Sequence, residues 1–279
     1  MILTGAQLKA KIRNMSGGDG KKAQTLLRMY IMERFLVRIS ESEFKDFFIL
    51  KGGMLVSALV GVHTRATMDI DTTIRAIPLT MEEASRVLNQ IINIQNPDGI
   101  TYRITNTKEI MEGFEYPGVR FLMEARLDNL REALRIDIST GDIITPSAVN
   151  YQYRLMFGDN AISLWTYNLE TLLAEKIETI VARGAANTRM RDFYDVFILT
   201  ELKNDNIDFH VLSNAIRATC EKRGTMYLLL SAQGGLSELG NNHDMERAWA
   251  AYRKDNFYVG EITWMQAFAS VSKLMSYIK

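Results

Sequence analysis

Apolar and polar residues follow two different rhythms along the chain, and the change between them lies near residue 165. Before that point, segments with apolar positions at helical spacing, such as residues 21–40, are interleaved with short strand-like runs. From about residue 168 onward, helical spacing recurs in one segment after another, as in a helical bundle. The pattern predicts an α/β (α+β) first domain, 1–165, and a mostly helical C-terminal domain, 166–279.

The strands of the first domain are marked by runs that favour extended structure. Such runs lie at residues 100–105, 118–127 and 132–140, and the last two flank a turn at Asp128 and Asn129. A small mixed sheet flanked by helices is therefore expected.

Two breaks between these elements are also readable. Pro78 ends a strand, and Thr80 is suited to cap a helix over residues 81–94. Residues 17–20, Gly-Gly-Asp-Gly, are not followed by the Lys and Ser or Thr of a phosphate-binding loop, so we expect a flexible linker there. In the second domain, helices are expected at 169–183, from 189 onward, and at 209–222, 225–232, 244–254 and 263–278.

Residues 51–74, KGGMLVSALVGVHTRATMDIDTTI, combine a Gly-Gly turn, a short apolar helix and a strand with two carboxylates. Side chains two residues apart on a strand point to the same face, about 6.6 Å apart, so Asp69 and Asp71 share a face while Met68 and Ile70 face the core. Neighbouring carboxylates repel each other unless a cation lies between them. Mg²⁺ is bound by such carboxylates together with substrate phosphates.

The glycines add to this interpretation. Gly52 and Gly53 permit a close backbone approach that a Cβ atom would block, so a triphosphate would fit beside the carboxylates. Each feature also has an ordinary explanation, because an Asp-x-Asp pair is common in edge strands and a Gly-Gly pair is often only a turn.

Three further charged positions admit a structural explanation from the sequence. Asp137 lies within an apolar strand, where a carboxylate would be costly unless it is paired, for example with Arg120 or Arg135. Lys176 fits a solvated stripe of its helix together with neighbouring glutamates. Asp192 lies near a predicted helix start, where the helix dipole favours an acidic side chain.

Composition indicates an ordinary globular protein, with 47% hydrophobic and 24% charged residues. The 33 basic and 33 acidic residues cancel, so no overall positive field draws the chain to nucleic acid. A single cysteine, Cys220, excludes an intramolecular disulfide and is expected to be a small buried residue. No apolar run approaches eighteen residues, and the start MILTGAQLKAK has no signal-peptide core, so we expect a cytoplasmic protein without a membrane partner.

The charge is uneven, however. The first forty residues form a basic flank that would contact RNA phosphates or be a solvated helix face. It contains two acidic residues and eight basic ones: Lys9, Lys11, Arg13, Lys21, Lys22, Arg28, Arg34 and Arg38.

The order of turn, helix and Asp-x-Asp strand resembles the polymerase-β-like nucleotidyltransferases. With Arg65-x-Thr67-x-Asp69-Ile-Asp71, it resembles more closely the AbiEii/AbiGii nucleotidyltransferase toxin family of type IV toxin–antitoxin and phage-abortive systems. LRIDIST at 134–140, LLAEKIETIVAR at 172–183 and RMRDFYDVFIL at 189–199 also fit in order, so the resemblance covers most of the chain. Two departures are the fifteen residues between Gly53 and Asp69 and the Lys-Gly-Gly that replaces the usual Gly-Ser.

The resemblance implies a nucleotidyltransferase core and a reaction that moves a nucleoside monophosphate from an NTP to a hydroxyl. It implies two Mg²⁺ ions held by Asp69, Asp71 and Asp137, with Asp142 a weaker candidate than Asp137. The nucleotide would be bound by Gly52, Gly53, Arg65, Thr67, Lys176 and Asp192. Asp195, or Asp192, would orient Lys176 or the nucleotide.

The resemblance further implies a toxin that inhibits growth or translation, whose acceptor is RNA, with a tRNA 3′ end as the leading candidate and GTP as the expected donor. An antitoxin encoded nearby is also implied. Two alternatives stay open: a non-catalytic nucleotide-binding regulator, and an enzyme that nucleotidylates a protein hydroxyl.

Overall fold

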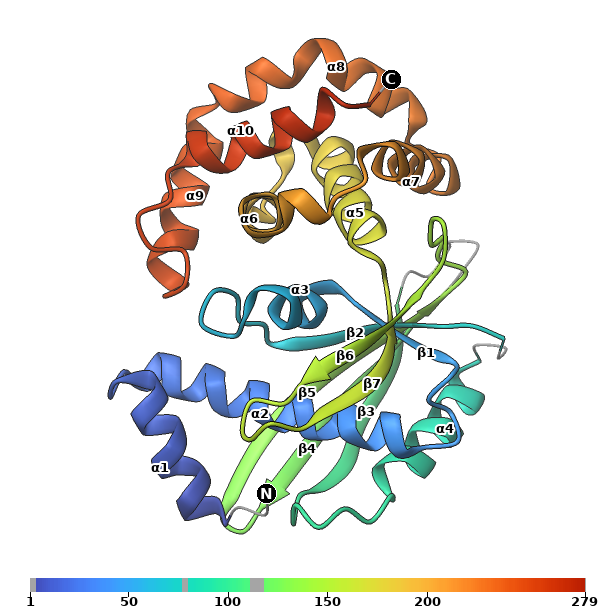
Figure 1. Cartoon of the computed structure of the whole chain (residues 1–279), viewed down its shortest axis with the longest axis vertical. Helices are drawn as coiled ribbons and strands as arrows, with labels where there is room; N and C mark the ends of the chain where they lie inside the picture. Colours follow the sequence, from blue (N-terminus) through green and yellow to red (C-terminus); the bar gives the residue numbers. More distant parts are fainter. Residues whose placement is uncertain (1–3, 77–79, 111–117, 279) are drawn as a thin grey trace. The chain divides into compact units, whose positions relative to one another are not determined.

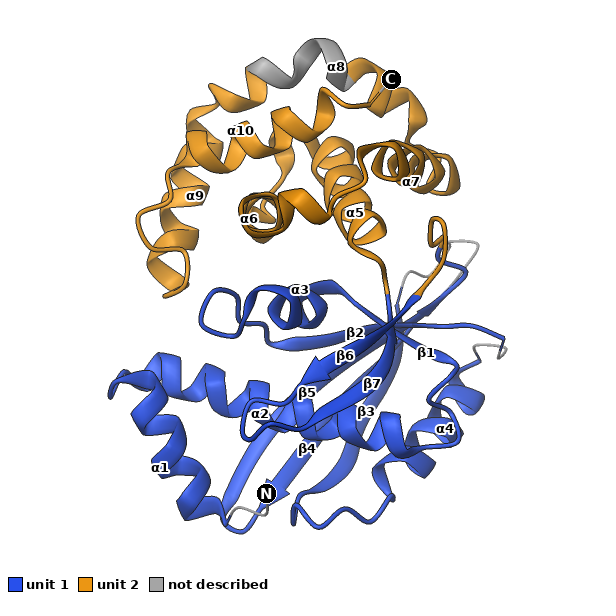
Figure 2. Cartoon of the chain, viewed as in Figure 1, with its two compact units in different colours: residues 1–142, 149–166 blue, residues 143–148, 167–279 orange. Residues whose placement is uncertain are grey.

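The structure is a computed structural model that describes residues 4–76, 80–110 and 118–278, apart from the side chains of residues 232–237. The chain forms two compact units, coloured separately in Figure 2. Unit 1 comprises Met1–Asp142 and Val149–Thr166, and unit 2 comprises Ile143–Ala148 and Tyr167–Lys279. Each unit is described by itself below.

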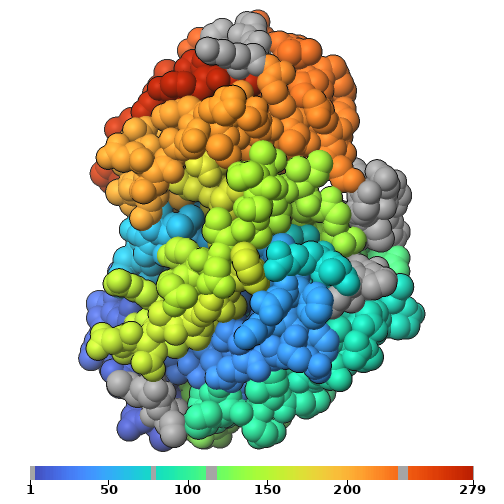
Figure 3. Space-filling view, turned by 45° about the vertical axis from the view of Figure 1, so that its right-hand side comes forward, coloured from blue at the N-terminus to red at the C-terminus, as the bar shows by residue number. Residues whose placement is uncertain are grey.

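Unit 1 is built on a seven-stranded mixed sheet in the order β3-β4-β5-β2-β1-β7-β6 (Figure 1). The pairs β2–β5 and β1–β7 are parallel, and the other neighbouring pairs are antiparallel. The strands are β1 Phe48–Lys51, β2 Asp69–Ile74, β3 Thr101–Ile110, β4 Gly118–Leu127, β5 Leu130–Thr140, β6 Val149–Arg154 and β7 Ala161–Thr166. In the space-filling view, residues 149–166 lie at the surface of this unit (Figure 3), as expected for an edge hairpin.

The predicted strands are present with small changes. β4 has the predicted limits, β5 begins two residues earlier than predicted, and β3 continues past an irregularity between Ile104 and Asn106. The turn between β4 and β5 contains Asp128 at a positive φ of 50°. Thr80 caps α4 as predicted, by accepting a hydrogen bond from the Glu83 N–H. Pro78 lies outside the described residues.

The described part of unit 1 contains four helices, namely α1 Gly5–Ser16, α2 Gly20–Glu41, α3 Gly52–Val60 and α4 Met81–Ile92. The predicted flexible linker at residues 17–20 is wrong, because these residues form a tight turn between α1 and α2. Gly17 ends α1 in the left-handed conformation, and the Asp19 side chain caps α2 by accepting a hydrogen bond from the Lys22 N–H. Two helix caps within four residues leave no free linker.

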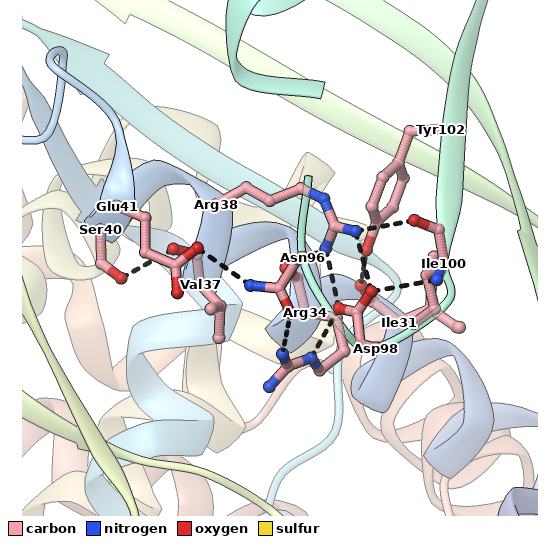
Figure 4. A network of polar contacts seen from close by, with 10 residues as sticks. All are labelled: Ile31, Arg34, Val37, Arg38, Ser40, Glu41, Asn96, Asp98, Ile100 and Tyr102. Atoms are coloured by element: carbon pink, nitrogen blue, oxygen red, sulfur yellow. Dashed lines mark hydrogen bonds and ion pairs between the residues drawn. The ribbon is translucent and has the colours of Figure 1, made fainter. Parts of the chain in front are cut away.

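Helix α2 is buried along most of its length and packs against β5, β7, α1 and α4. A network of polar contacts joins it to the segment that leads into β3 (Figure 4). Arg38, which is 1% exposed, donates hydrogen bonds to both carboxylate oxygens of Asp98 and to the Ile100 carbonyl. Arg34 donates a further hydrogen bond to Asp98 at 2.9 Å. A buried charge is tolerated only when it is paired in this way.

The two faces of the sheet differ in burial. On β4 and β5, Phe121, Met123, Leu134 and Ile136 alternate with exposed or half-buried residues and form the core beneath α2. The opposite face carries the polar residues of the same strands, including Asp137. The fold therefore leaves one polar face on the central strands.

Unit 2 is helical, as predicted. Its helices are α5 Leu169–Arg183, α6 Met190–Lys203, α7 Phe209–Lys222, α8 Met226–Gly240, α9 His243–Asp255 and α10 Trp264–Met275, with short 3₁₀ turns at Gly184–Ala186 and Asn204–Asn206. Phe193, Trp249 and Trp264 meet in its core, and Cys220 is buried as predicted. Among the described residues, none of the helices combines the length and apolar character needed to cross a lipid bilayer.

Candidate active site

Three predicted carboxylates lie on one face of two neighbouring strands. β2 and β5 run parallel, and their register pairs Asp71 with Asp137 and Asp69 with Arg135. Paired residues of adjacent strands point to the same face, and adjacent strands are about 4.8 Å apart. Asp69, Asp71 and Asp137 therefore share one face, although they come from segments more than sixty residues apart.

The Gly-Gly turn lies directly against these strands. Gly52 has a φ of +63°, and a Cβ atom there would lie 2.8 Å from the Asp71 Cβ atom. A Cβ atom on Gly53 would lie 2.6 Å from the Thr67 hydroxyl and 3.3 Å from an Arg65 guanidinium nitrogen. Five residues predicted as site residues are thus in close contact: Gly52, Gly53, Arg65, Thr67 and Asp71.

Arg65 and Thr67 are both buried, at 3% and 8% exposure. Arg65 donates a short hydrogen bond to the carbonyl of Ala66, and the Thr67 N–H faces the Met29 sulfur at 3.3 Å. Both residues fix the loop that leads into β2. The expectation that Met68 faces the core is wrong: it is 42% exposed, because β2 begins only at Asp69 and Met68 lies in the preceding loop beside Arg28.

Two arginines balance the carboxylates. Arg120 on β4 donates two hydrogen bonds to Asp137, at 2.7 and 2.6 Å, and Arg135 on β5 donates to Asp69. The predicted alternative of an Asp137–Arg120 pair is therefore present. Such paired hydrogen bonds from a planar guanidinium hold the carboxylate in a fixed orientation, which keeps Asp137 on the face that it shares with Asp71.

A lysine that the sequence analysis did not select also lies at this face. Lys51 pairs with Asp71 in the β1–β2 register, and its ammonium group is 2.6 Å from Asp142. Burial alone would raise the pKa of Asp142, but Lys51, together with hydrogen bonds from Ser139 and Thr73, lowers that pKa to about 2. The signal in the sequence was the lysine directly before the Gly-Gly turn. Asp142 itself binds Lys51, which accounts for it without a metal.

In unit 2, the predicted residues Lys176, Asp192 and Asp195 form one buried cluster. The Lys176 ammonium group is 2.9 Å from Asp192 and 2.7 Å from Asp195, and all three side chains are less than 10% exposed. Arg189 contacts the second oxygen of Asp192 at 2.8 Å. Burial alone would raise the pKa of Asp192, but the charges of Lys176 and Arg189 outweigh it and lower the pKa. The solvated stripe considered from the sequence is wrong, because Lys176 lies inside the unit.

The carboxylates of unit 1 fit a hard divalent cation in chemistry. Among the described residues, no three His, Cys, Asp or Glu side chains come together as a ready-made metal cage. Mg²⁺ does not require such a cage, since it is usually bound by one or two carboxylates, waters and the phosphates of a substrate. Asp69, Asp71 and Asp137 supply oxygen ligands on one face, and the Gly52 turn beside them is too tight for a Cβ atom.

Comparison with known proteins agrees with this arrangement. The family described as the nucleotidyl transferase AbiEii toxin of type IV TA systems matches residues 34–270. No curated protein sequence matches the chain. The structure is similar to that of JHP933 from Helicobacter pylori, with a TM-score of 0.55, 14% identity and 91% of each chain covered. A second H. pylori protein, described as a candidate nucleotidyltransferase, gives a TM-score of 0.55 at 13% identity, over 91% of this chain and 94% of that one.

The two structural similarities confirm the predicted fold class, a mixed sheet flanked by helices and followed by a helical part. The family match extends from α2 into α10 and so includes every predicted site residue. The chain belongs to the AbiEii family of type IV toxin–antitoxin systems and is a nucleotidyltransferase.

Proposed function

We propose that this chain is a Mg²⁺-dependent toxin that transfers a nucleoside monophosphate from an NTP, with GTP as the expected donor, to the 3′ hydroxyl of a tRNA. Blocking a tRNA end would inhibit translation and growth, as a toxin or phage-abortive system requires. The observation that carries the proposal is the register that brings Asp71 and Asp137 side by side, next to the Gly52 turn.

Each residue of unit 1 has a specific role in this proposal. Asp69 and Asp71 hold the divalent cations, and Asp137 holds one cation and orients the attacking hydroxyl. Bound cations neutralise the charge that develops on the attacking and leaving oxygens. Gly52 and Gly53 let the triphosphate approach the backbone, while Arg65 and Thr67 fix the adjoining loop, Thr67 through its contact with the turn.

The arginine pairs support this assignment of the carboxylates. In the structure, Arg120 neutralises the charge of Asp137 and Arg135 neutralises that of Asp69. In the enzyme with bound substrate, a divalent cation would supply this positive charge. A cluster of carboxylates without either kind of counter-charge would resist ionisation. We therefore expect both arginines to exchange part of their contacts when metal and NTP bind.

Transfer of label from α-labelled NTPs, each supplied separately with Mg²⁺ and total tRNA, tests the proposal. Asp69→Ala and Asp71→Ala should each lower the transfer rate more than about 100-fold. Loss of a residue that only hydrogen-bonds to a metal ligand already costs up to about 100-fold, and loss of the ligand itself should cost more. Asp46→Ala is a matched control, because Asp46 is an exposed carboxylate that lies before β1.

The outcome separates the possible functions. Label on RNA with wild type and Asp46→Ala alone supports the proposal and identifies the base. Label on protein would keep the enzyme and replace the acceptor. If NTP binds but no label is transferred to RNA or protein, the chain is a nucleotide-binding regulator.

For unit 2, we propose that Lys176 binds nucleotide phosphates and that Asp192 and Asp195 orient it. Loss of Lys176 would leave two buried carboxylates without its charge, so Lys176→Met should lower the free energy of unfolding by about 3–5 kcal/mol. If Lys176 also binds the nucleotide phosphates, Lys176→Met should in addition weaken NTP binding more than NMP binding, because an NTP has more phosphates. Equal weakening of both nucleotides, measured by calorimetry on folded protein, would leave Lys176 with a structural role only.

The family also implies a partner. A type IV toxin–antitoxin family suggests that an antitoxin counteracts this chain, and we propose that its gene lies nearby.

A further inference from the structure

Over strands β3, β4 and β5, the sheet face that carries Asp137 is exposed. Positions on this face are defined by the register, which pairs Arg103 with Glu124 and Arg126 with Arg131. The side chains of Arg103 and Arg126 are 69% and 46% exposed, and Leu122 between them and Asp137 is 37% exposed. We call this area, from Leu122 outward, the open sheet face.

The charge of the open sheet face is strongly positive. It carries Arg103 from β3, Arg126 from β4 and Arg131 from β5, all exposed. Among the described residues of this area, Glu124 is the one acidic side chain, and Arg126 contacts it at 2.6 Å while Arg103 lies 3.6 Å away. Three cations around one anion are more than are needed to neutralise Glu124, in a chain whose net charge is zero.

The position of this charge matters more than its amount. Arg131 and Asp137 lie on the same face of β5, six residues apart, which corresponds to about 20 Å along a strand. The arginines thus begin where the carboxylates end and lead away from them across three strands. An acceptor whose last hydroxyl is at Asp137 would extend its chain over this surface.

We propose that the open sheet face binds the phosphates of the RNA strand whose 3′ end is the acceptor. This proposal rests on the proposed function, and it assigns acceptor binding to Arg103, Arg126 and Arg131. Guanidinium groups suit this task because they bind phosphate with paired hydrogen bonds and also stack on bases. Contacts of these arginines to RNA phosphates would be largely independent of sequence.

The basic flank on α1 and α2 provides a matched control. Lys9, Lys21 and Lys22 lie there, outside the open sheet face, and their replacement by Gln removes three positive charges. We call this triple variant the basic-flank variant. The test variant, called the open-face variant, is Arg103→Gln/Arg126→Gln/Arg131→Gln and removes three charges from the open sheet face. Both triple variants change exposed or half-buried side chains, so their Tm values should stay close to that of wild type.

The first measurement is the affinity for end-labelled single-stranded RNA at several salt concentrations. The open-face variant should bind at least about tenfold more weakly, and the slope of log K against log salt should fall by about 2 for three lost contacts. The basic-flank variant should keep the slope of wild type. In the transfer assay, the open-face variant should raise KM for tRNA and leave KM for the NTP unchanged.

Glu124→Gln gives a prediction of the opposite sign. It removes the anion from the open sheet face, so RNA should bind a few-fold more tightly, a gain that misfolding cannot produce. If wild type labels RNA but neither the arginine variant nor Glu124→Gln changes RNA affinity, the proposed surface is wrong while the proposed function stands. The surface is also wrong if the basic-flank variant alone weakens binding. If wild type binds and labels no RNA, the proposed acceptor fails, and the surface with it.

Discussion

Glu33 is a single carboxyl group inside unit 1, and its ionisation should make the stability of the fold depend on pH. It is 3% exposed and accepts a 2.6 Å hydrogen bond from the Met156 N–H, which joins α2 to the loop between β6 and β7. Burial raises the pKa of Glu33 to about 8, and the Met156 hydrogen bond and the charge of Arg34 offset only part of this effect.

The sign of the pH effect follows from proton binding. Between pH 4.5 and 8, the folded state keeps the Glu33 proton that the unfolded state releases, so the free energy of unfolding falls as pH rises. Glu33→Gln should remove this loss. Urea unfolding at pH 5 and pH 7 should show a decrease in wild type that is about 2–3 kcal/mol larger than in the variant. Equal pH dependence in both proteins would show that Glu33 has an ordinary pKa.

Individual residues differ in how far the sequence reveals them. Asp69 and Asp71 were predicted to share a face, because a strand fixes the direction of alternate side chains without any tertiary information. The ion pair between Arg120 and Asp137 could only be named as one of two options, since it depends on which strands are neighbours. Lys51 was overlooked because its partner Asp142 lies 91 residues away.

At the scale of elements, the turn between β1 and α3 sets the shape of the candidate site. Gly52 is in the left-handed conformation and touches Asp71, whereas Gly17 has the same φ of 63° and would present a Cβ atom to open space. Alanine at Gly17 would therefore introduce backbone strain alone, whereas alanine at Gly52 would introduce the same strain and a steric clash with Asp71.

Gly17→Ala should lower the free energy of unfolding by about 1–2 kcal/mol, the cost of a left-handed non-glycine residue. Gly52→Ala should cost about 1–3 kcal/mol more because the new Cβ atom displaces Asp71. Transfer activity should be kept in Gly17→Ala and lost in Gly52→Ala, when both are assayed below their Tm. Full activity in Gly52→Ala would show that the turn tolerates a side chain and that the position of Asp71 is not critical.

The elements themselves were largely predictable, while their pairing was not. Helix α5 and strand β4 have the predicted limits, since each has a clear apolar period and a cap or turn at its ends. Helix α1 was missed, although Thr4 and Gln7 form a capping box at its start. The parallel register of β2 and β5 brings together the carboxylates, and no local pattern specifies a pairing across 65 residues.

At the scale of the whole molecule, neither unit is one continuous segment. Unit 1 is interrupted by Ile143–Ala148, which belongs to unit 2 through hydrogen bonds from the Asn168 side chain to the Thr145 and Ser147 carbonyls. We propose a domain boundary near residue 166 on this basis.

A fragment of residues 1–166 contains every strand of unit 1, whereas residues 1–142 lack β6 and β7. The longer fragment should unfold cooperatively in urea. The shorter one should lose that transition, because β1 then becomes an unpaired sheet edge. Identical cooperative transitions in both fragments would show that β7 is not needed to complete the sheet.

The place of β7 beside β1 also has a consequence during synthesis on the ribosome. β1 ends at Lys51, but its parallel partner is completed only at Thr166, 115 residues later. At about 5–20 residues per second, the ribosome needs on the order of 6–23 s for this stretch. β1, the strand that leads into the Gly52 turn, therefore stays unpaired on one side while the nascent chain grows. The complete sheet, and any activity that depends on it, can therefore form only after Thr166 has been synthesised.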